Sequence, residues 1–240
     1  MELQAGSLAR SLIRRLAFIL TEMSIPKCIA VLLSGRGSNF QSLLRASHAD
    51  LLGGNISLVV ANRPGAGGLD IAQNAGIETA LIDHQAYASR AAFDRDLAAT
   101  IETVSPDLVV LAGFMRILTP DFVARFENRL MNIHPSLLPL YPGLNTHQRA
   151  LDNGDSHAGA TVHYVNGELD GGPPVLQARV AIGEDDSAET LAAKVLAVEH
   201  QIYPEAVNWH LTGRLSFEDG VLHKDAQPVP LTGCLWDGNK

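Results

Sequence analysis

The chain has 240 residues, of which 46% are hydrophobic and 18% are charged, and its formal net charge at pH 7 is −8. This composition excludes a disordered chain, because it supplies enough apolar side chains to bury a full core. The negative charge disfavours a nucleic-acid groove as the principal site, since phosphate backbones are bound by fields of lysine and arginine. With two cysteines and no Cys-x-x-Cys spacing, the sequence predicts neither a disulfide framework nor a structural metal, and it favours a reducing, cytoplasmic location.

The first twenty-odd residues have a pattern of their own. Leu8, Leu12 and Leu16 recur at helical spacing, with Arg14 and Arg15 among them, which makes a basic amphipathic stretch. No apolar run in the chain approaches the length of a membrane span. We interpret residues 1–24 as an N-terminal extension outside the core, with a transit peptide as the alternative, and residues 25–240 as one domain.

From Lys27 onward, short apolar runs alternate with helical patterns, which is typical of β-α-β units around a parallel sheet. Phe93, Leu97 and Ile101 stand four residues apart and mark one face of a helix. Strands are predicted at 28–33, 56–61, 79–82 and 108–112, and helices at 40–46, 69–75 and 88–103. The fold class is therefore α/β, with a doubly wound, mainly parallel open sheet whose ligands collect beyond the carboxyl ends of the strands.

The second half of the chain begins with loops rich in Pro, Gly and His. Strands are predicted at 130–133, 161–165 and 175–182, some of them antiparallel to the first group. A long amphipathic helix is predicted at 187–211, with Ser187 as its N-cap. The tail around Phe217, Gly220 and Leu222 predicts a small C-terminal hairpin.

The sequence S-G-R-G-S-N at 34–39 lies between the first strand and the first helix. Glycines permit close backbone approach, and free N–H groups at a helix start can hold a phosphate. Gly37, Ser38 and Asn39 are the candidate phosphate ligands. The pattern matches neither the Walker motif nor the full dinucleotide fingerprint, so a turn with no ligand is the alternative.

A second segment, G-F-M-R-I-L at 113–118, also follows a predicted strand. Its apolar side chains could wall a pocket for a flat heterocycle. The alternative is that they are ordinary core, which is the commoner role of such residues.

Polar side chains of the second half could carry chemistry. Asn132 and His134 lie two residues apart, so in a strand they project to the same side. An amide donor and an imidazole together are suited to a developing oxyanion. Asp170, in the turn E-L-D-G-G-P at 168–173, could orient His134 or accept a proton. Each residue alone also fits a structural role, as a hydrogen-bonding histidine or a turn aspartate.

The motifs S-G-R-G-S-N, L-A-G-F-M-R-I-L, N-I-H-P-S-L-L-P-L-Y-P-G-L-N-T-H and E-L-D-G-G-P, in this order, closely resemble those of the phosphoribosylglycinamide formyltransferases, folate-dependent formyltransferases of purine synthesis. The resemblance extends from about Ile29 to Tyr203. It implies the formyltransferase fold and the transfer of a formyl group from 10-formyltetrahydrofolate to the primary amine of glycinamide ribonucleotide. It implies no metal, no nucleic-acid partner and no membrane, and it leaves a monomer or a homodimer open.

The resemblance also assigns roles by motif. It makes Asn132, His134 and Asp170 the catalytic trio, and Gly37, Ser38, Asn39 and Glu199 the nucleotide ligands. On the folate side it places Arg90, Met115, Arg116, Ile117, Leu118, Asn132, Asn166, Gly167, Glu168, Leu169 and Asp170. Arg36, Arg90 and Arg116 could then supply local positive charge for phosphate and for the glutamate of folate. Two positions depart from the family pattern, namely Asn145, where a histidine is usual, and Leu196, where a polar residue is frequent one turn before Glu199.

Several other functions are compatible with parts of this pattern. Methionyl-tRNA formyltransferase shares the trio, but it has an added C-terminal domain and a basic face for tRNA that these 240 residues do not suggest. Formyltetrahydrofolate deformylase, which transfers the formyl group to water, and a non-catalytic folate or nucleotide sensor are the remaining alternatives.

Overall fold

The structure, a computed structural model, describes residues 26–238. The predicted extension over residues 1–24 lies outside the described part. The main sheet has eight strands in the order β11-β7-β6-β5-β4-β1-β2-β3. These strands are β1 (Lys27–Leu33), β2 (Gly54–Ala61), β3 (Glu78–Leu81), β4 (Leu108–Leu111), β5 (Leu130–His134), β6 (His157–Tyr164), β7 (Pro174–Ala181) and β11 (Cys234–Leu235).

Strands β1 to β5 are mutually parallel, so their carboxyl ends meet at one edge of the sheet. Strand β6 then runs antiparallel to both β5 and β7. The reversal brings the chain after β5 back past the carboxyl end of that strand. This confirms the predicted open sheet, including its antiparallel part.

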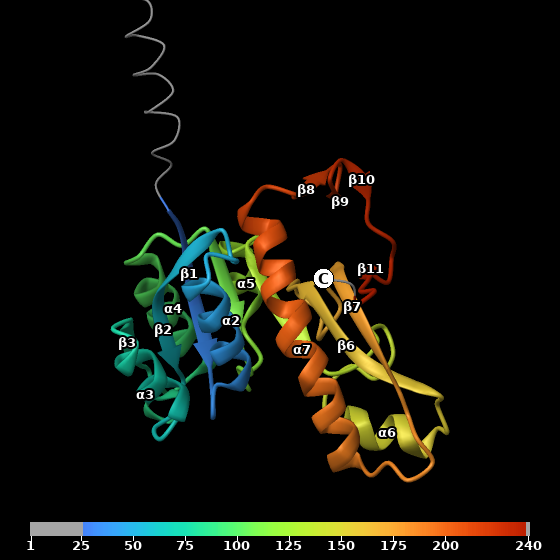
Figure 1. Cartoon of the computed structure of the whole chain (residues 1–240). Coiled ribbons are helices and arrows are strands. Elements are labelled where there is room, and N and C mark those ends of the chain that lie inside the picture. Colours follow the sequence, from blue (N-terminus) through green and yellow to red (C-terminus); the bar gives the residue numbers. More distant parts are fainter. Residues whose placement is uncertain (1–25, 239–240) are drawn as a thin grey trace, which may run out of the picture.

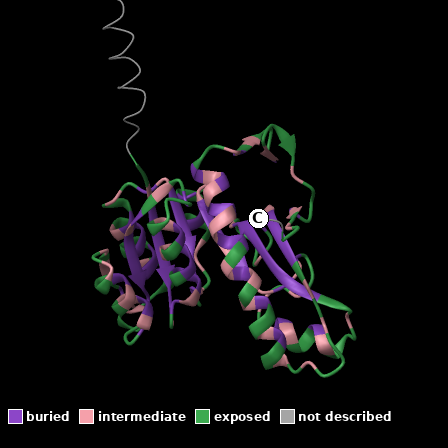
Figure 2. Cartoon of the chain, in the orientation of Figure 1, coloured by how far each residue is buried: buried purple, intermediate pink, exposed green. Residues whose placement is uncertain are grey.

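Helices cover both faces of the sheet (Figure 1). Side chains alternate along β1, so that Val31 packs on the face covered by α2, α3 and α7, while Leu32 packs on the face covered by α4 and α5. In Figure 2 the buried strands stand out between helices whose residues are partly buried and partly exposed. The helices are α2 (Ser38–His48), α3 (Gly67–Asn74), α4 (Arg90–Glu102), α5 (Pro120–Arg125), α6 (Thr146–Asp152), α7 (Ala188–Leu211) and the short 3-10 helix η1 (His84–Ala86).

The long helix α7 lies across the sheet between its β1–β3 side and its β6–β7 side (Figure 1). Ser187 caps its first turn by accepting a hydrogen bond from the amide of Thr190, as the sequence predicts. Tyr203 is fully buried, and its hydroxyl donates to the carbonyl oxygens of Leu111 at 2.9 Å and Met131 at 3.1 Å. The helix is thereby fastened to β4 and β5, next to the strand end that carries His134.

Most predicted elements are confirmed to within a few residues, including the buried face marked by Phe93, Leu97 and Ile101. The sequence interpretation missed α5 and α6, which are only six and seven residues long. The predicted hairpin exists as β8 (Leu215–Glu218) and β9 (Val221–Lys224), but β10 (Gln227–Pro228) adds a third strand to it. After this small sheet the chain returns to the main sheet as β11, which the sequence analysis also missed.

No helix within residues 26–238 is long and apolar enough to cross a membrane.

Tyr203→Phe removes the hydroxyl that joins α7 to β4 and β5. We expect the free energy of unfolding to fall by about 1–2 kcal/mol, because two buried carbonyl groups lose a donor. Urea denaturation of the variant and the wild type measures this difference. Tyr87→Phe removes a hydroxyl that is hydrogen-bonded to the exposed Asp96, outside these contacts, so it serves as the control and should lower stability by less than about 1 kcal/mol. Equal effects of the two substitutions would contradict the assigned role of Tyr203.

Candidate active site

The turn between β1 and α2 lies at the carboxyl edge of the parallel strands. Gly37 has a φ of 79°, and a Cβ atom there would approach Gly68 Cα to 2.8 Å, so the position requires glycine. Ser34 accepts a hydrogen bond on its hydroxyl from the amide of Met115 at 2.7 Å. The glycine-rich turn and the 113–118 segment are therefore neighbours, because they follow the adjacent parallel strands β1 and β4.

Asn39 and Glu199 form a buried pair below this turn. The amide nitrogen of Asn39 donates to Oε2 of Glu199 at 2.6 Å, across 160 residues of sequence. Burial raises the pKa of Glu199, although the hydrogen bond from Asn39 opposes that rise. The amide oxygen of Asn39 is buried and has no hydrogen-bond partner among the residues described. Buried polar atoms are normally satisfied, so this oxygen marks a place for a ligand or water.

The 115–118 segment presents two of its apolar side chains to solvent. Met115 is 67% exposed and Ile117 is 58% exposed, whereas Leu118 packs partly against the core. Exposed large apolar side chains at a strand end fit a ligand wall better than they fit the alternative of ordinary core.

Arg116 and Arg90 bring positive charge to the same region. The guanidinium of Arg116 lies 4.7 Å from the ring centre of Phe93, an attractive cation–π contact. Its Nε is buried and finds no hydrogen-bond acceptor within the described part of the chain. Arg90 begins α4, the helix that also carries Phe93, and is exposed. Both arginines are thus placed where an anionic or polar ligand would meet them.

The predicted catalytic residues come together at the end of β5. Nδ1 of His134 lies 3.4 Å from Oδ2 of Asp170, and both side chains are largely buried. Asn132 and His134 alternate correctly along β5 to share a face. A fourth polar side chain, His163 on β6, pairs with Asn132 across the antiparallel ladder and lies 3.2 Å from its amide nitrogen.

Both ring nitrogens of His134 face oxygen atoms that accept hydrogen bonds. Nε2 is 2.9 Å from the carbonyl oxygen of Tyr141, and Nδ1 faces the carboxylate of Asp170. Because neither oxygen can donate, the geometry suits an imidazolium that carries a proton on each nitrogen. An imidazole in this place therefore has an acceptor oxygen beside each of its two nitrogens.

Asp170 also joins two loops. Its Oδ2 accepts a hydrogen bond from the amide of Gly143 at 2.8 Å, which ties the loop after β5 to the loop between β6 and β7. Asp170 has a φ of 52°, a left-handed conformation that aspartate tolerates better than most residues. Close by, a Cβ atom at Gly172 would meet the carbonyl oxygen of Tyr164 at 1.9 Å. The Asp-Gly-Gly turn is thus both an ordinary turn and the support of the carboxylate.

The rest of the loop between β6 and β7 carries the remaining predicted folate ligands. Asn166, Gly167, Glu168 and Leu169 are all exposed. The side chain of Asn166 accepts a hydrogen bond from the amide of Glu168 at 2.9 Å, which shapes the loop locally. Leu169 is 60% exposed and Leu144, on the facing loop, is 75% exposed. Their exposure leaves these residues accessible to a ligand.

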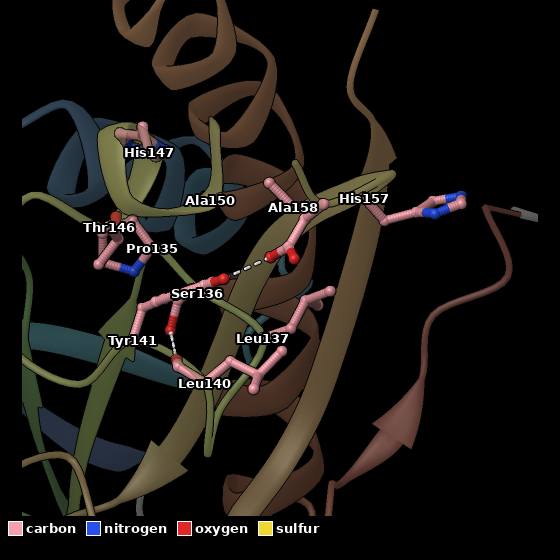
Figure 3. Close-up of a pocket in the computed structure, with 11 residues that line it drawn as sticks. Pro135, Ser136, Leu137, Leu140, Tyr141, Thr146, His147, Ala150, His157 and Ala158 are labelled. Carbon is pink, nitrogen blue, oxygen red and sulfur yellow. Dashed lines mark hydrogen bonds between the residues drawn. The ribbon is translucent and has the colours of Figure 1, made fainter. Parts of the chain in front are cut away.

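The loop after β5 is stabilised by hydrogen bonds of its own side chains. Figure 3 shows a small pocket lined by Pro135, Ser136, Tyr141 and His147 among others. The hydroxyl of Ser136 donates to the carbonyl of Leu140, and that of Tyr141 donates to Asp155, both at 2.6 Å. The pocket does not include Asn132, His134 or Asp170 among its lining residues. The residues that line it stabilise the loop after β5, which holds the carbonyl of Tyr141 next to His134.

The two departures from the family pattern lie beside these elements. Asn145 precedes α6 with a φ of 60°, and its side chain makes no capping hydrogen bond. Leu196 is half-buried on α7, one turn before Glu199. Within the described part of the chain, neither residue forms a hydrogen bond or an ion pair with the trio.

The sequence analysis missed His163 and the backbone of Tyr141 and Gly143 as parts of the site. His163 lies outside the motifs on which the sequence analysis relied. The signal that would have found it is its register opposite Asn132, which requires knowing the strand pairing. Among residues 26–238 no group of three or more His, Cys, Asp or Glu side chains could hold a metal ion.

Comparison with known proteins places this fold and site in a class. Residues 27–207 match the model of the family described as "Formyl transferase". The chain therefore belongs to the formyl transferase family, a class that the fold and the polar trio fit.

The more similar relatives narrow the class. The chain is 47% identical over 209 residues to a phosphoribosylglycinamide formyltransferase of Escherichia coli strain K12, covering 87% of this chain and 99% of that one. A solved phosphoribosylglycinamide formyltransferase from Coxiella burnetii superposes with a TM-score of 0.84 at 44% identity, covering 88% and 99% of the two chains. The human trifunctional purine biosynthetic protein adenosine-3 matches over 185 residues at 40% identity, 77% of this chain and 18% of that protein. Within its family the chain thus groups with the phosphoribosylglycinamide formyltransferases.

Glu199→Gln should stabilise the fold more at pH 8 than at pH 5. Burial raises the pKa of Glu199 in the folded state, so folding becomes less favourable as the pH rises through that raised pKa and the buried carboxyl ionises. Glutamine stays neutral and still offers an oxygen to Asn39. Urea denaturation at both pH values measures the difference between variant and wild type. The exposed Glu127→Gln is the matched control and should show no such pH dependence; a stabilisation of Glu199→Gln that is equal at the two pH values would contradict this.

Proposed function

We propose that this chain transfers the formyl group of 10-formyltetrahydrofolate to the primary amine of glycinamide ribonucleotide, giving formylglycinamide ribonucleotide and tetrahydrofolate in purine synthesis. The observation that carries the proposal is the partly buried cluster of Asn132, His134 and Asp170, with His134 3.4 Å from Asp170. The family membership and the high identity to phosphoribosylglycinamide formyltransferases support it.

The chemistry needs stabilisation of negative charge. When an amine attacks a formyl carbon, charge develops on the formyl oxygen, and donors or positive charge placed beside that oxygen lower the barrier. The imidazolium of His134 is the one positive group of the trio, and the carboxylate of Asp170 balances it. Asn132 contributes an amide N–H from the same face of β5. The site therefore offers a preformed environment for the oxyanion.

Proton transfer is the second requirement. The attacking amine must lose a proton and the departing nitrogen must gain one. Asp170 is the carboxylate nearest to the imidazole, and it could accept the proton of the amine directly or through water. Its hydrogen bond from the amide of Gly143 fixes the direction of one oxygen, which leaves the other to face the reacting groups.

The two substrates would approach from different sides. The glycine-rich turn, with Gly37, Ser38 and Asn39, would hold the phosphate, and Glu199 would accept the sugar hydroxyls. The buried, unpartnered oxygen of Asn39 accepts hydrogen bonds, so it supports the placement of the sugar hydroxyls beside Glu199 and not that of the phosphate. The folate would lie against the exposed Met115 and Ile117 and the loop of 166–170. Arg90 and Arg116 would neutralise its anionic groups, and the unpartnered Nε of Arg116 fits that role.

The decisive assay combines the purified chain with both substrates and follows tetrahydrofolate and the formylated nucleotide. A parallel reaction omits the nucleotide. We expect product only when glycinamide ribonucleotide is present. Formate release without the nucleotide would instead make the chain a formyltetrahydrofolate hydrolase, and binding of both ligands without turnover would make it a sensor.

His134→Ala and Asp170→Ala should each lower kcat by at least about 100-fold, because each removes a group that acts on the charge or proton of the transition state. His223→Ala and Asp185→Ala, at positions outside the site, are the matched controls. The measurements are steady-state kcat and a thermal unfolding curve for each variant. Near-wild-type turnover in either site variant, with both folded, would refute the assigned role.

A further inference from the structure

His163 is a buried polar residue that the proposed mechanism does not use. It lies on β6 directly opposite Asn132 on β5, and only 2% of it is exposed. Its two ring nitrogens each have one close neighbour. Nδ1 is 2.8 Å from the carbonyl oxygen of Tyr164, and Nε2 is 3.2 Å from the amide nitrogen of Asn132. A side chain this buried, and touching a residue of the trio, calls for a role.

The surroundings of His163 determine where its proton sits. A carbonyl oxygen can only accept a hydrogen bond, so Nδ1, which faces Tyr164, must be the nitrogen that carries hydrogen. Burial, together with the nearby His134, lowers the pKa of His163 to about 4, against the opposing effects of the hydrogen bond to the Tyr164 carbonyl and of Asp170. The ring is therefore neutral at physiological pH, and Nε2 keeps a lone pair.

This lone pair decides which atom of Asn132 can face it. An amide oxygen would meet the lone pair of Nε2 with a lone pair of its own, whereas the amide nitrogen donates a hydrogen bond. Nε2 also lies 4.0 Å from Oδ1 of Asp170, the carboxylate that pairs with His134. The amide nitrogen of Asn132 is thus drawn to the side of the site where Asp170 and His134 lie.

We propose that His163 is a positioning residue for formyl transfer, which acts by accepting a hydrogen bond from Asn132 and so fixing the orientation of its amide group. One N–H of Asn132 is used by His163, and the other stays free to stabilise the formyl oxygen. Without this acceptor the amide could rotate and present its oxygen, which would repel the developing negative charge. The inference rests on the proposed function for the identity of the reaction.

Matched substitutions separate the acceptor from the packing. His163→Gln keeps an acceptor near the position of Nε2, while His163→Met has a similar length and removes it. We expect the methionine variant to lose at least about tenfold in kcat, less than a typical deleted oxyanion donor. The KM values of both substrates should change by less than about twofold, because the effect is on the transition state. The glutamine variant should retain kcat to within about threefold of the wild type. Equal kcat values for the two variants would overturn the proposal.

A purely structural role is tested by coupling. In an Asn132→Ala background the amide is gone, so the variants that also carry His163→Gln or His163→Met should differ in kcat by less than about twofold. The same tenfold loss in that background would mean that His163 acts by another route, and it would overturn the proposal.

The proton position can be measured without any loss of folding. A long-range proton–nitrogen NMR spectrum of the histidine side chains in the full-length wild-type chain, with His163 assigned by the signals that disappear in His163→Gln, reports which nitrogen is protonated. At pH 7.5 we expect a neutral ring protonated on Nδ1. A proton on Nε2, or a cationic ring, would overturn the proposal even if the chain catalyses formyl transfer. Failure of the wild-type chain to form product would instead refute the proposed function and leave the measured proton position intact.

Discussion

The contact between His134 and Asp170 is the interaction on which the rest of the site depends. It joins the end of a parallel strand to a loop that the chain reaches only after β6 has turned back beside β5. The left-handed conformation of Asp170 and the close approach of Gly172 to Tyr164 bring the carboxylate to the imidazole. The same carboxylate accepts a hydrogen bond from the amide of Gly143, so the two loops and the pair of His134 and Asp170 form one unit. A charge this buried requires such partners, since an unpaired one would be costly.

Helix α7 links this unit to the glycine-rich turn, where we propose that the nucleotide binds. Glu199 and Tyr203 lie one turn apart on the same face of the helix. Glu199 meets Asn39 at the glycine-rich turn, while Tyr203 binds the carbonyls of β4 and β5. One helix therefore sets the distance between the glycine-rich turn and the strand that carries Asn132 and His134. Holding two substrates in one geometry can lower a reaction barrier substantially. Helix α7 provides the connection that would hold them in this way.

The sequence was sufficient for the parallel half of the fold, because apolar runs and helical spacing are local signals. The trio was predicted as a set only through the resemblance of its motifs to a known family. It was insufficient where the structure depends on contacts distant in the chain. His163 acquires its place only through the register of β5 against β6, and β11 has two residues that form a strand because β7 offers a free edge. Helix α6 begins after Asn145 without a side-chain cap, so the usual start signal is absent. Tyr203 is an aromatic residue on an apolar helix, and no local sequence signal shows that its hydroxyl binds carbonyl groups of β4 and β5.

The central claim is that His134 and Asp170 act as one charged unit, and a double-mutant cycle on kcat tests it most directly. Rates of formyl transfer would be measured for the wild type, His134→Ala, Asp170→Ala and the double variant, all shown to be folded. If the two residues act together, the double variant should be about as slow as the slower single variant, because the first substitution already disables the unit. Losses that multiply fully in the double variant would show two independent groups and would contradict the claim.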